Sequence, residues 1–512
     1  MKFLVIFLSF TIMACGGSTT SSTAQDTVPT ATKPATSRTN VTQNLKGNYP
    51  SEADIKATDT PIYGKGGADF TIEVAGRAPG RADLVGFYAE QNVLVDTTVV
   101  GVDGKIKFKK PEGYPQGLYY VSIAKNRYVQ VMLDDDQKFT MSTKFSNPDE
   151  NMIVKGSDSN SALYENILFE RAGSPKFDAV AQKIKAAAEG SAEKEKYTAE
   201  QQVLTEERQA HLDALYKKHP KSLFTKFKQA GANPEVRTDV PEDKVVFHYR
   251  NDFWKGVDFS DRRLLRTPVI HNKLKRYFTE LTAQNQDSIY ASATRLCDQV
   301  LTHPEYYMFF TNWVVRQYEP TKTTLMDPEF VHVKMIQRYF KKDRAFWADS
   351  LEVFALQQRA GEMAQSLLGD QGPDVTAKDL NGKTHQLMAS KADYLIVYMF
   401  APSCEHCQEQ TPLLVDWYNK NKAEGKSRDV YAIALDSNVD DPNELANYIA
   451  KTKMPFPCVW DPTNRSIYKR YYVDITPEIY VLDPDRKIIA KNLKVFQIDT
   501  MIDRDIEKRN GK

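Results

Sequence analysis

The segment YLIVYMFAPSCEHCQEQ, residues 394–410, joins an apolar run directly to a pair of cysteines. Six consecutive apolar or aromatic residues, Leu395 to Phe400, have the length and composition of a buried strand. Pro402 interrupts this run, and a helical pattern begins after Cys404. The first cysteine of the pair is therefore predicted to lie at the end of a buried strand and the start of a helix.

The position of Cys404 predicts a reactive thiol. The unpaired backbone N–H groups and the dipole at a helix start favour negative charge, so they lower the pKa of a thiol there. Cys407 lies one helical turn further on, close enough to form a disulfide with Cys404. Between them, a partly positive His406 would stabilise the Cys404 thiolate, whereas the carboxylate of Glu405 would oppose it. The pattern predicts a redox dithiol that these two residues tune.

The composition is that of a globular protein of several domains. The chain has 512 residues, of which 41% are hydrophobic and 26% are charged. Its net charge of +1, without a basic block, gives no indication of nucleic-acid binding. No metal or other cofactor is expected, because the two clustered cysteines and His406 supply at most three ligands.

The five cysteines have to be interpreted singly, because an odd and small number argues against a disulfide scaffold. Cys297 lies on an apolar helical face, and Cys458 lies in the apolar sequence PFPCVWD. Both are predicted to be core residues rather than redox thiols.

The N-terminus is typical of an exported, lipidated protein. Residues 1–14 form an apolar run that is too short to span a bilayer and is predicted to be a signal peptide. Ile12 to Cys15 resembles a bacterial lipobox, which implies cleavage before Cys15, lipidation of its thiol and attachment to a membrane. An ordinary secretory signal that is cut elsewhere is the alternative. Either way the mature chain is expected in the cell envelope, where disulfide chemistry is permitted.

Residues 15–66 are predicted to carry the lipidated Cys15 on a disordered tether, because Ser, Thr, Ala and Pro dominate the sequence. No acidic cluster follows Cys15, and in many Gram-negative lipoproteins such a cluster resembles a surface-export signal. The chain is therefore predicted to face the periplasm from the outer membrane.

Residues 67–155 alternate with a period of two and are predicted to form a small antiparallel β sandwich or barrel of unknown function. A calcium loop at Asp134 to Asp136 is disfavoured, because the glycine and downstream glutamate of such a loop are absent, so a solvated turn is predicted. The expected strands are Phe70–Val74, Leu84–Tyr88, Val93–Val100, Ile106–Phe108, Leu118–Ile123, Tyr128–Leu133 and Phe139–Thr143.

Residues 156–366 change to a period of 3.6 and are predicted to form an all-α domain of unknown function. Helices are expected over Tyr197–Tyr216, from Asp287, and from Asp327-Pro328-Glu329, where a cap, a proline and an acid coincide. The aromatic stretch 248–259 could be a ligand surface, but packing against a neighbouring domain is the favoured interpretation.

Residues 367–512 alternate between strands and helices. Two short strands around Asn381-Gly382 are expected first, and the sequence Thr476-Pro477 precedes a strand and a closing hairpin. The other expected elements are strand Leu395–Phe400, helix Glu405–Lys422, strand Val430–Leu435, helix Pro442–Lys451, segment Phe456–Trp460, helix Arg465–Tyr471, strand Glu478–Leu482 and strand Lys487–Lys491.

A strand that ends in CxxC, this βα order and a Thr-Pro before the last hairpin together resemble the thioredoxin fold, and within it the TlpA/ResA-type redoxins. The resemblance implies that Pro477 is cis and that the Thr476 backbone pairs with a substrate strand. From about Phe70 onward the chain resembles Gram-negative lipoproteins that join a β domain, a helical domain and a redoxin domain, and residues 248–274 and 326–333 look like the helical domain.

The sequence departs from these families at three positions. Tyr398 stands where thioredoxins carry a buried Asp, Gln410 where related tethered reductases carry a Glu, and Ser403 where a Trp usually precedes the first cysteine. Because both carboxylates are missing, the proton acceptor for the resolving thiol is left open. The candidates are Glu405, Glu409, Glu478 and water.

The predicted function is a thiol–disulfide oxidoreductase that acts on protein disulfides, with Cys404 as attacking and Cys407 as resolving thiol. The resemblance favours a reductase that receives electrons from an unidentified redox protein. One alternative is an envelope scaffold or binding lipoprotein with a vestigial redox domain. The other is a thiol peroxidase, which is disfavoured because Ala401 stands where peroxiredoxins need Thr or Ser.

Overall fold

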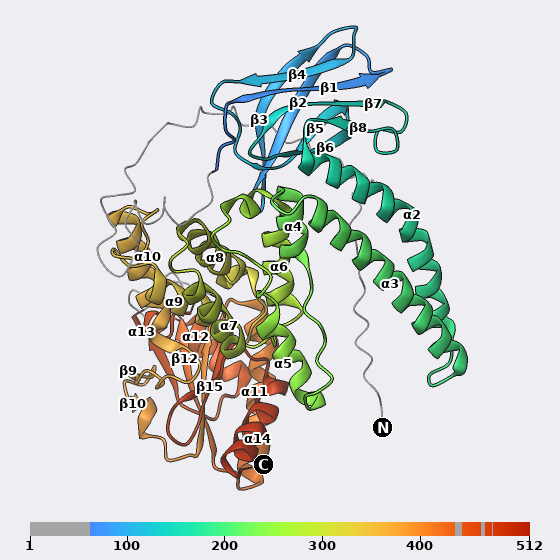
Figure 1. Cartoon of the computed structure of the whole chain (residues 1–512). Coiled ribbons are helices and arrows are strands. Elements are labelled where there is room, and N and C mark those ends of the chain that lie inside the picture. The colour runs from blue at the N-terminus through green and yellow to red at the C-terminus, as the bar shows by residue number, and fades with distance from the viewer. Residues whose placement is uncertain (1–61, 436–442, 462–465, 474, 512) are drawn as a thin grey trace. The chain divides into compact units, whose positions relative to one another are not determined.

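The computed structural model describes residues 62–435, 443–461, 466–473 and 475–511 (Figure 1). The predicted signal peptide, Cys15 and most of the tether lie outside these residues. Within the described ranges, no helix is both long enough and apolar enough to cross a bilayer. Three regions follow one another along the chain: strands to residue 155, helices to residue 366, and a mixed α/β region after it.

The strand region consists of two four-stranded sheets, in the orders β4-β1-β7-β8 and β3-β2-β5-β6. In β1, every second residue from Ala68 to Val74 is buried, and these side chains join one core with residues of the second sheet. The predicted sandwich is therefore confirmed. Its strands are β1 (Ala68–Ala75), β2 (Gly80–Tyr88), β3 (Gln91–Val100), β4 (Lys105–Lys110), β5 (Gly117–Ala124), β6 (Arg127–Leu133), β7 (Gln137–Lys144) and β8 (Ile153–Lys155).

Two features of this sandwich differ from the prediction. The strands β1 and β7 are parallel, with Phe70 opposite Phe139, so the sandwich is not purely antiparallel. The reason is the chain path: it leaves the first sheet after β1 and forms β2 and β3 in the second, and β7 returns beside β1. The three-residue strand β8 was also not predicted, because so short a segment shows no alternation.

The helical region begins with a hairpin of two long helices, α2 and α3, which Figure 1 shows side by side. The predicted helix start at Asp327 is confirmed, with the Asp327 carboxylate accepting from the N–H groups of Glu329 and Phe330. The helix expected from Asp287 begins one residue earlier, because Asn285 is its cap. The elements are α2 (Asp158–Ala186), α3 (Ala192–Lys218), α4 (Leu223–Gly231), α5 (Glu242–Asp252), η2 (Arg262–Arg266), α6 (Pro268–Thr279), α7 (Gln286–Gln299), α8 (Pro304–Gln317), η3 (Pro320–Lys322), α9 (Pro328–Tyr339), α10 (Ser350–Met363) and η4 (Ala364–Ser366).

The aromatic stretch near residue 254 is a packing element, but Trp254 packs on helices of its own region and not, as predicted, on a neighbouring domain. Trp254 lies 5.5 Å from Phe310 and 5.8 Å from Tyr277, measured between ring centroids. Phe253, Trp254 and Phe259 are all buried. Cys297 is fully buried on α7, as expected for a core residue.

The C-terminal region is built on a five-stranded sheet in the order β13-β12-β11-β14-β15, a thioredoxin-like arrangement. Strands β13, β12 and β11 are parallel, whereas β14 and β15 are antiparallel to their neighbours. Helices α11, α12 and α14 cover one face and α13 covers the other. The elements are β9 (Thr376–Lys378), β10 (Thr384–Gln386), η5 (Leu387–Ala389), β11 (Tyr394–Phe400), α11 (Glu405–Ala423), β12 (Arg428–Leu435), α12 (Glu444–Thr452), β13 (Cys458–Asp461), α13 (Ser466–Tyr471), β14 (Glu478–Leu482), β15 (Ile488–Ala490), η6 (Val495–Gln497) and α14 (Ile498–Arg509).

A buried ion cluster connects the last strand to the helical region. The Lys491 ammonium lies 2.8 Å from a Glu329 carboxylate oxygen and 3.6 Å from an oxygen of Asp327. The Asp327 carboxylate also accepts from the N–H of Leu368 at 2.7 Å. Burial raises the pKa of Asp327 to about 6, although the charge of Lys491 opposes this shift. The two regions are thus held together by charges that solvent does not reach.

Candidate functional site

The two cysteines lie where β11 gives way to α11, as the sequence predicts. All seven residues of β11 are buried, and the strand pairs with β12 on one side and β14 on the other. Cys404 is the cap residue that precedes α11, and Cys407 lies in its first turn. The centre of the sheet therefore fixes the position of the dithiol.

Cys404 is partly exposed, and backbone groups surround its sulfur. The sulfur accepts a hydrogen bond from the Cys407 N–H at 3.3 Å and lies 3.2 Å from the Thr476 carbonyl oxygen. Burial raises the pKa of the Cys404 thiol, but hydrogen bonds from the Cys407 thiol, the Thr476 side chain and the N–H groups of Cys407 and His406 outweigh it. The net pKa is below the ordinary value for cysteine, so this sulfur has increased thiolate character.

Cys407 has the opposite character. Its side chain is fully buried, and both cysteines are free thiols. Burial, together with the hydrogen bond to Cys404, raises the pKa of the Cys407 thiol to about 12. One accessible, acidified sulfur and one buried, protonated sulfur are therefore held within one helical turn of each other.

Thr476 and Pro477 lie directly beside the dithiol, as the resemblance implies. The bond between them is cis, and the strand β14 begins at the next residue. The Thr476 carbonyl contacts the Cys404 sulfur, so this loop and the dithiol form one site.

Tyr398, which occupies the position of the missing carboxylate, begins a chain of buried hydroxyl groups. Its hydroxyl lies 2.7 Å from that of Thr411, which lies 2.7 Å from that of Tyr448, and Tyr448 donates to the Cys407 carbonyl at 3.0 Å. Because Tyr448 donates its only proton to Cys407, Thr411 must donate to Tyr448, and Tyr398 to Thr411. Burial raises the pKa of Tyr448 to about 12, so the chain is neutral near pH 7.

The remaining site candidates are the side chains near the dithiol that the sequence singled out, and they lie in different environments. The ring of His406 is 80% exposed, with Nδ1 at 3.8 Å from Glu409, and the backbone N–H of His406 is the group that contributes to lowering the Cys404 pKa. Glu405 is exposed as well. Glu478 pairs with Met399, which packs on the sheet face opposite to the one that holds Cys407. Gln410, at the second carboxylate position, accepts from the Val495 N–H at 3.1 Å.

The other described cysteines do not resemble Cys404. Burial raises the pKa of Cys297 well above its usual range and that of Cys458 to about 12. Both are buried among apolar residues, which agrees with the core role predicted for them.

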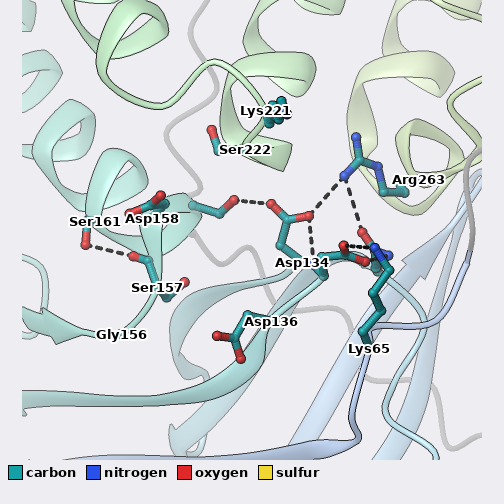
Figure 2. A pocket seen from close by; sticks show the side chains of 13 residues that line it. Lys65, Asp134, Asp136, Gly156, Ser157, Asp158, Ser161, Lys221, Ser222 and Arg263 are labelled. Atoms are coloured by element: carbon teal, nitrogen blue, oxygen red, sulfur yellow. Dashed lines mark hydrogen bonds and ion pairs between the residues drawn. The ribbon is translucent and has the colours of Figure 1, made fainter.

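A polar pocket of about 530 Å³ lies between strand and helical elements, and Figure 2 shows Asp134 and Arg263 pointing toward each other in it. Asp134 accepts from Arg263 at 3.0 Å, from Ser159 at 2.6 Å and from the Leu223 N–H at 2.7 Å. The predicted solvated turn is confirmed at Asp135 and Asp136, which are exposed, but it is wrong for Asp134, because partners far along the chain bind its carboxylate. Within the described residues, no group of three or more acidic, His or Cys side chains could hold a metal ion.

One family model matches the C-terminal region of the chain. Residues 368–491 match the AhpC/TSA family. Thiol-disulfide oxidoreductase ResA from Bacillus cereus is 28% identical over 126 residues, which are 24% of this chain and 68% of the relative. The relatives named ResA thus cover about a quarter of the chain.

Solved structures match the chain as well. A domain described as a "possible thiol-disulfide isomerase" from Cytophaga hutchinsonii is 32% identical, with a TM-score of 0.26, over 29% of this chain and 99% of that domain. A thioredoxin-like protein from Bacteroides caccae is 16% identical, with a TM-score of 0.42, over 53% of this chain and 97% of that protein. Together with the ResA similarity, the arrangement of the two cysteines supports a thiol–disulfide oxidoreductase.

Proposed function

We propose that this chain, a thiol–disulfide oxidoreductase by its similarity to ResA, is a membrane-anchored reductase of protein disulfides in the cell envelope. The observation that carries the proposal is the asymmetric thiol pair: Cys404 is acidified and accessible, whereas Cys407 is buried and protonated. Such a pair suits a sequential exchange of disulfides.

The proposed reaction has two steps. The Cys404 thiolate attacks one sulfur of a substrate disulfide, so a mixed disulfide forms and the other substrate sulfur leaves as a thiolate. Cys407 then loses its proton and attacks the Cys404 sulfur, which releases the second substrate thiolate. Two electrons pass to the substrate, its thiolates take up protons, and the Cys404–Cys407 disulfide remains.

Renewed activity requires a reductant, which we propose is a dithiol redox protein. The backbone of Thr476, adjacent to the Cys404 sulfur, is proposed to pair with the extended substrate chain, and Pro477 shapes this loop. No bound cofactor is part of the scheme, because both electrons come from the two sulfurs.

The second step depends on removing the proton from Cys407, whose pKa is about 12. The neutral hydroxyl chain that begins at Tyr398 holds the Cys407 carbonyl but is a poor base. Water, or the exposed carboxylate of Glu405 or Glu409, is proposed to take the proton as the mixed disulfide opens. Glu478 is disfavoured for this role, because it belongs to the opposite sheet face.

The anchoring of the protein is proposed from its N-terminal sequence. Removal of residues 1–14 and lipidation of Cys15 would attach the chain to the outer membrane, facing the periplasm, through the tether that ends near residue 66. The segments 67–155, 156–366 and 367–512 are proposed as the folded domains. Mass spectrometry of the mature N-terminus should find a diacylglyceryl group on Cys15, and an unmodified chain that starts elsewhere would refute the anchor.

A direct test is the reduction of insulin disulfides by the full chain without residues 1–15. The wild type should accelerate reduction by dithiothreitol, Cys404→Ser should not, and Cys407→Ser should accumulate a mixed disulfide. Cys458→Ala is the matched control, because it removes a buried thiol outside the site. Equal rates for the wild type and Cys404→Ser would refute the proposal and favour the scaffold alternative.

The peroxidase alternative is tested in parallel. Ala401 is buried beside the dithiol and provides no hydroxyl group to bind a peroxide. We therefore expect hydrogen peroxide to be consumed no faster than by free cysteine. Rapid peroxide turnover that requires Cys404 would support the peroxidase instead.

A further inference from the structure

Helix α10 presents two large apolar side chains to solvent. Leu351 is 76% and Phe354 is 65% exposed, although other residues of the same helix, Val353, Ala360 and Met363, are buried. Leu351, Phe354 and Ala355 follow the spacing i, i+3, i+4, so they share one face of the helix. We call the surface formed by these three residues the apolar face of α10.

A groove of about 330 Å³ continues from this face. It is lined by Ala355, Gln358, Arg359 and Glu362 of α10 and, from the C-terminal region, by Tyr472. Gln358 and Glu362 continue the same helical face, at i+7 and i+11 from Leu351. The groove is therefore polar at one end and leads to exposed apolar side chains at the other.

The groove lies close to the dithiol along the chain. Tyr472 is four residues from Thr476, so their Cα atoms are at most about 14 Å apart. Thr476 contacts the Cys404 sulfur, and its neighbour Ile475 is 78% exposed. An extended chain that leaves Thr476 toward Tyr472 would therefore reach the groove within about five residues.

We propose that the groove and the apolar face of α10 bind the extended chain that flanks the disulfide of a protein substrate. This inference rests on the proposed function and assigns the helical region a part in choosing the substrate. Residues about five positions from the substrate cysteine lie in the groove. Apolar residues about six to nine positions away contact Phe354 and Leu351, because the helix adds about 1.5 Å per residue.

The short chain distance from Tyr472, in the groove, to Thr476, at the Cys404 sulfur, favours a substrate chain over a second copy of this protein as the occupant. The polar side chains of Gln358, Arg359 and Glu362 suit the backbone groups of a strand, which need hydrogen-bond partners when water leaves. The exposed apolar residues of α10 then bind residues that flank the substrate cysteine. A small disulfide has no such flanking residues, so it gains no affinity from this surface.

The test compares two disulfide probes, each a cysteine peptide activated with 2-nitro-5-thiobenzoate. One has three residues, and the other has about twenty, with Leu, Ile and Phe at about six to nine positions on both sides of the cysteine. We expect wild-type Cys404 to react about tenfold faster with the long probe at limiting concentration. In Leu351→Glu/Phe354→Glu this preference should fall to about one, while the short probe reacts at the wild-type rate.

Val99→Glu/Val102→Glu is the matched control, because it places the same charges at exposed valines of the strand region. It should keep the tenfold preference. A preference retained in the α10 variant, or equal loss for both probes, overturns the proposal.

Two further outcomes also decide against this surface. A dimer that the α10 variant dissociates in light scattering would assign the apolar face to a second copy. A wild type that reacts with neither probe refutes the proposed function and this inference with it.

Discussion

The dithiol site and the polar pocket of Figure 2 both contain groups that can carry a charge, but only in the pocket do charged partners neutralise them. In the pocket, Asp134 has a cation, a hydroxyl and a backbone N–H as partners, and Arg263 is paired with Asp134 and Asp261. In the dithiol site, hydrogen bonds favour a charge on Cys404 but no cationic side chain is among the groups that lower its pKa. In the pocket, the charge of Asp134 is neutralised by its partners. In the dithiol site, the negative charge on Cys404 has no counter-ion among these groups, so the thiolate can react.

This difference explains why the polar pocket is a weaker candidate for chemistry than the dithiol site. A carboxylate that is already bound by a guanidinium and two other donors has little affinity left for a ligand. The partners of Asp134 lie in separate segments of the chain, at Ser159, Leu223 and Arg263, so we assign this carboxylate the role of holding these segments together. Reactivity belongs instead to the sulfur that helix-end dipoles stabilise and that remains partly exposed.

The largest expected effect is the loss of activity in Cys404→Ser. Disulfide reduction should fall to the uncatalysed rate, since a serine hydroxyl is not ionised near neutral pH. Asp134→Asn should leave the rate constant of reduction unchanged in protein that is still folded. If Asp134→Asn lowered the rate as much as Cys404→Ser, the polar pocket would also be part of the chemistry, which contradicts the comparison.

The second prediction concerns the pH dependence of alkylation by iodoacetamide. The pKa of Cys404 is below its ordinary value and burial raises that of Cys407 to about 12, so at neutral pH the thiolate fraction of Cys404 far exceeds that of Cys407. Raising the pH should therefore saturate labelling of Cys404 first, while labelling of Cys407 continues to rise. Mass spectrometry of the two positions measures this order, and simultaneous labelling would contradict it.

The third prediction concerns stability. Arg263→Met leaves Asp134 and Asp261 without their shared cation, and removing one partner of a buried pair lowers the free energy of unfolding by about 3–5 kcal/mol. Lys65→Met is the control, because its pair with Asp135 is exposed and solvent screens it, so the unfolding midpoint should barely change. Urea unfolding measures both, and equal midpoints would show that the pocket does not hold the segments together.

The smallest expected effect is that of Tyr448→Phe. It removes the hydroxyl that donates to Cys407 but keeps the ring that stacks on Phe400 with centroids 5.4 Å apart. We expect the free energy of unfolding to fall by about 1 kcal/mol, with alkylation of Cys404 unchanged. Tyr128→Phe, on a half-exposed strand residue, controls for hydroxyl loss. A large change in the rate of Cys404 alkylation would contradict this prediction and would show that the hydroxyl chain affects the reactivity of Cys404.

Features that depend on local sequence could be predicted. Three confirmed features each depend on only a few neighbouring residues. They are the alternation of β1, the apolar run of β11 and the cap at Asp327. The position of Cys404 at a helix start and its contact with Thr476 followed from the motif and from the resemblance.

Features that depend on distant partners could not. Asp134 looked like a solvated turn because Arg263, its cation, lies 129 residues away. Tyr398 was noted only as a missing carboxylate, since its hydroxyl chain needs Thr411 and Tyr448 to be placed in space. The parallel pairing of β1 with β7 likewise depends on the path of the chain between them.

The ion cluster at Lys491 limits how far the C-terminal region is autonomous. A fragment that begins at residue 367 would retain Lys491 but lose Asp327 and Glu329, the two carboxylates that neutralise it. The Leu368 N–H would lose its acceptor in the same cut. The edge strand of a separately expressed fragment would therefore carry a newly uncovered ammonium beside Tyr480, 5.4 Å from the centre of its ring. A redox module cut from this protein therefore has to begin upstream of α9 if it is to keep both carboxylates beside Lys491.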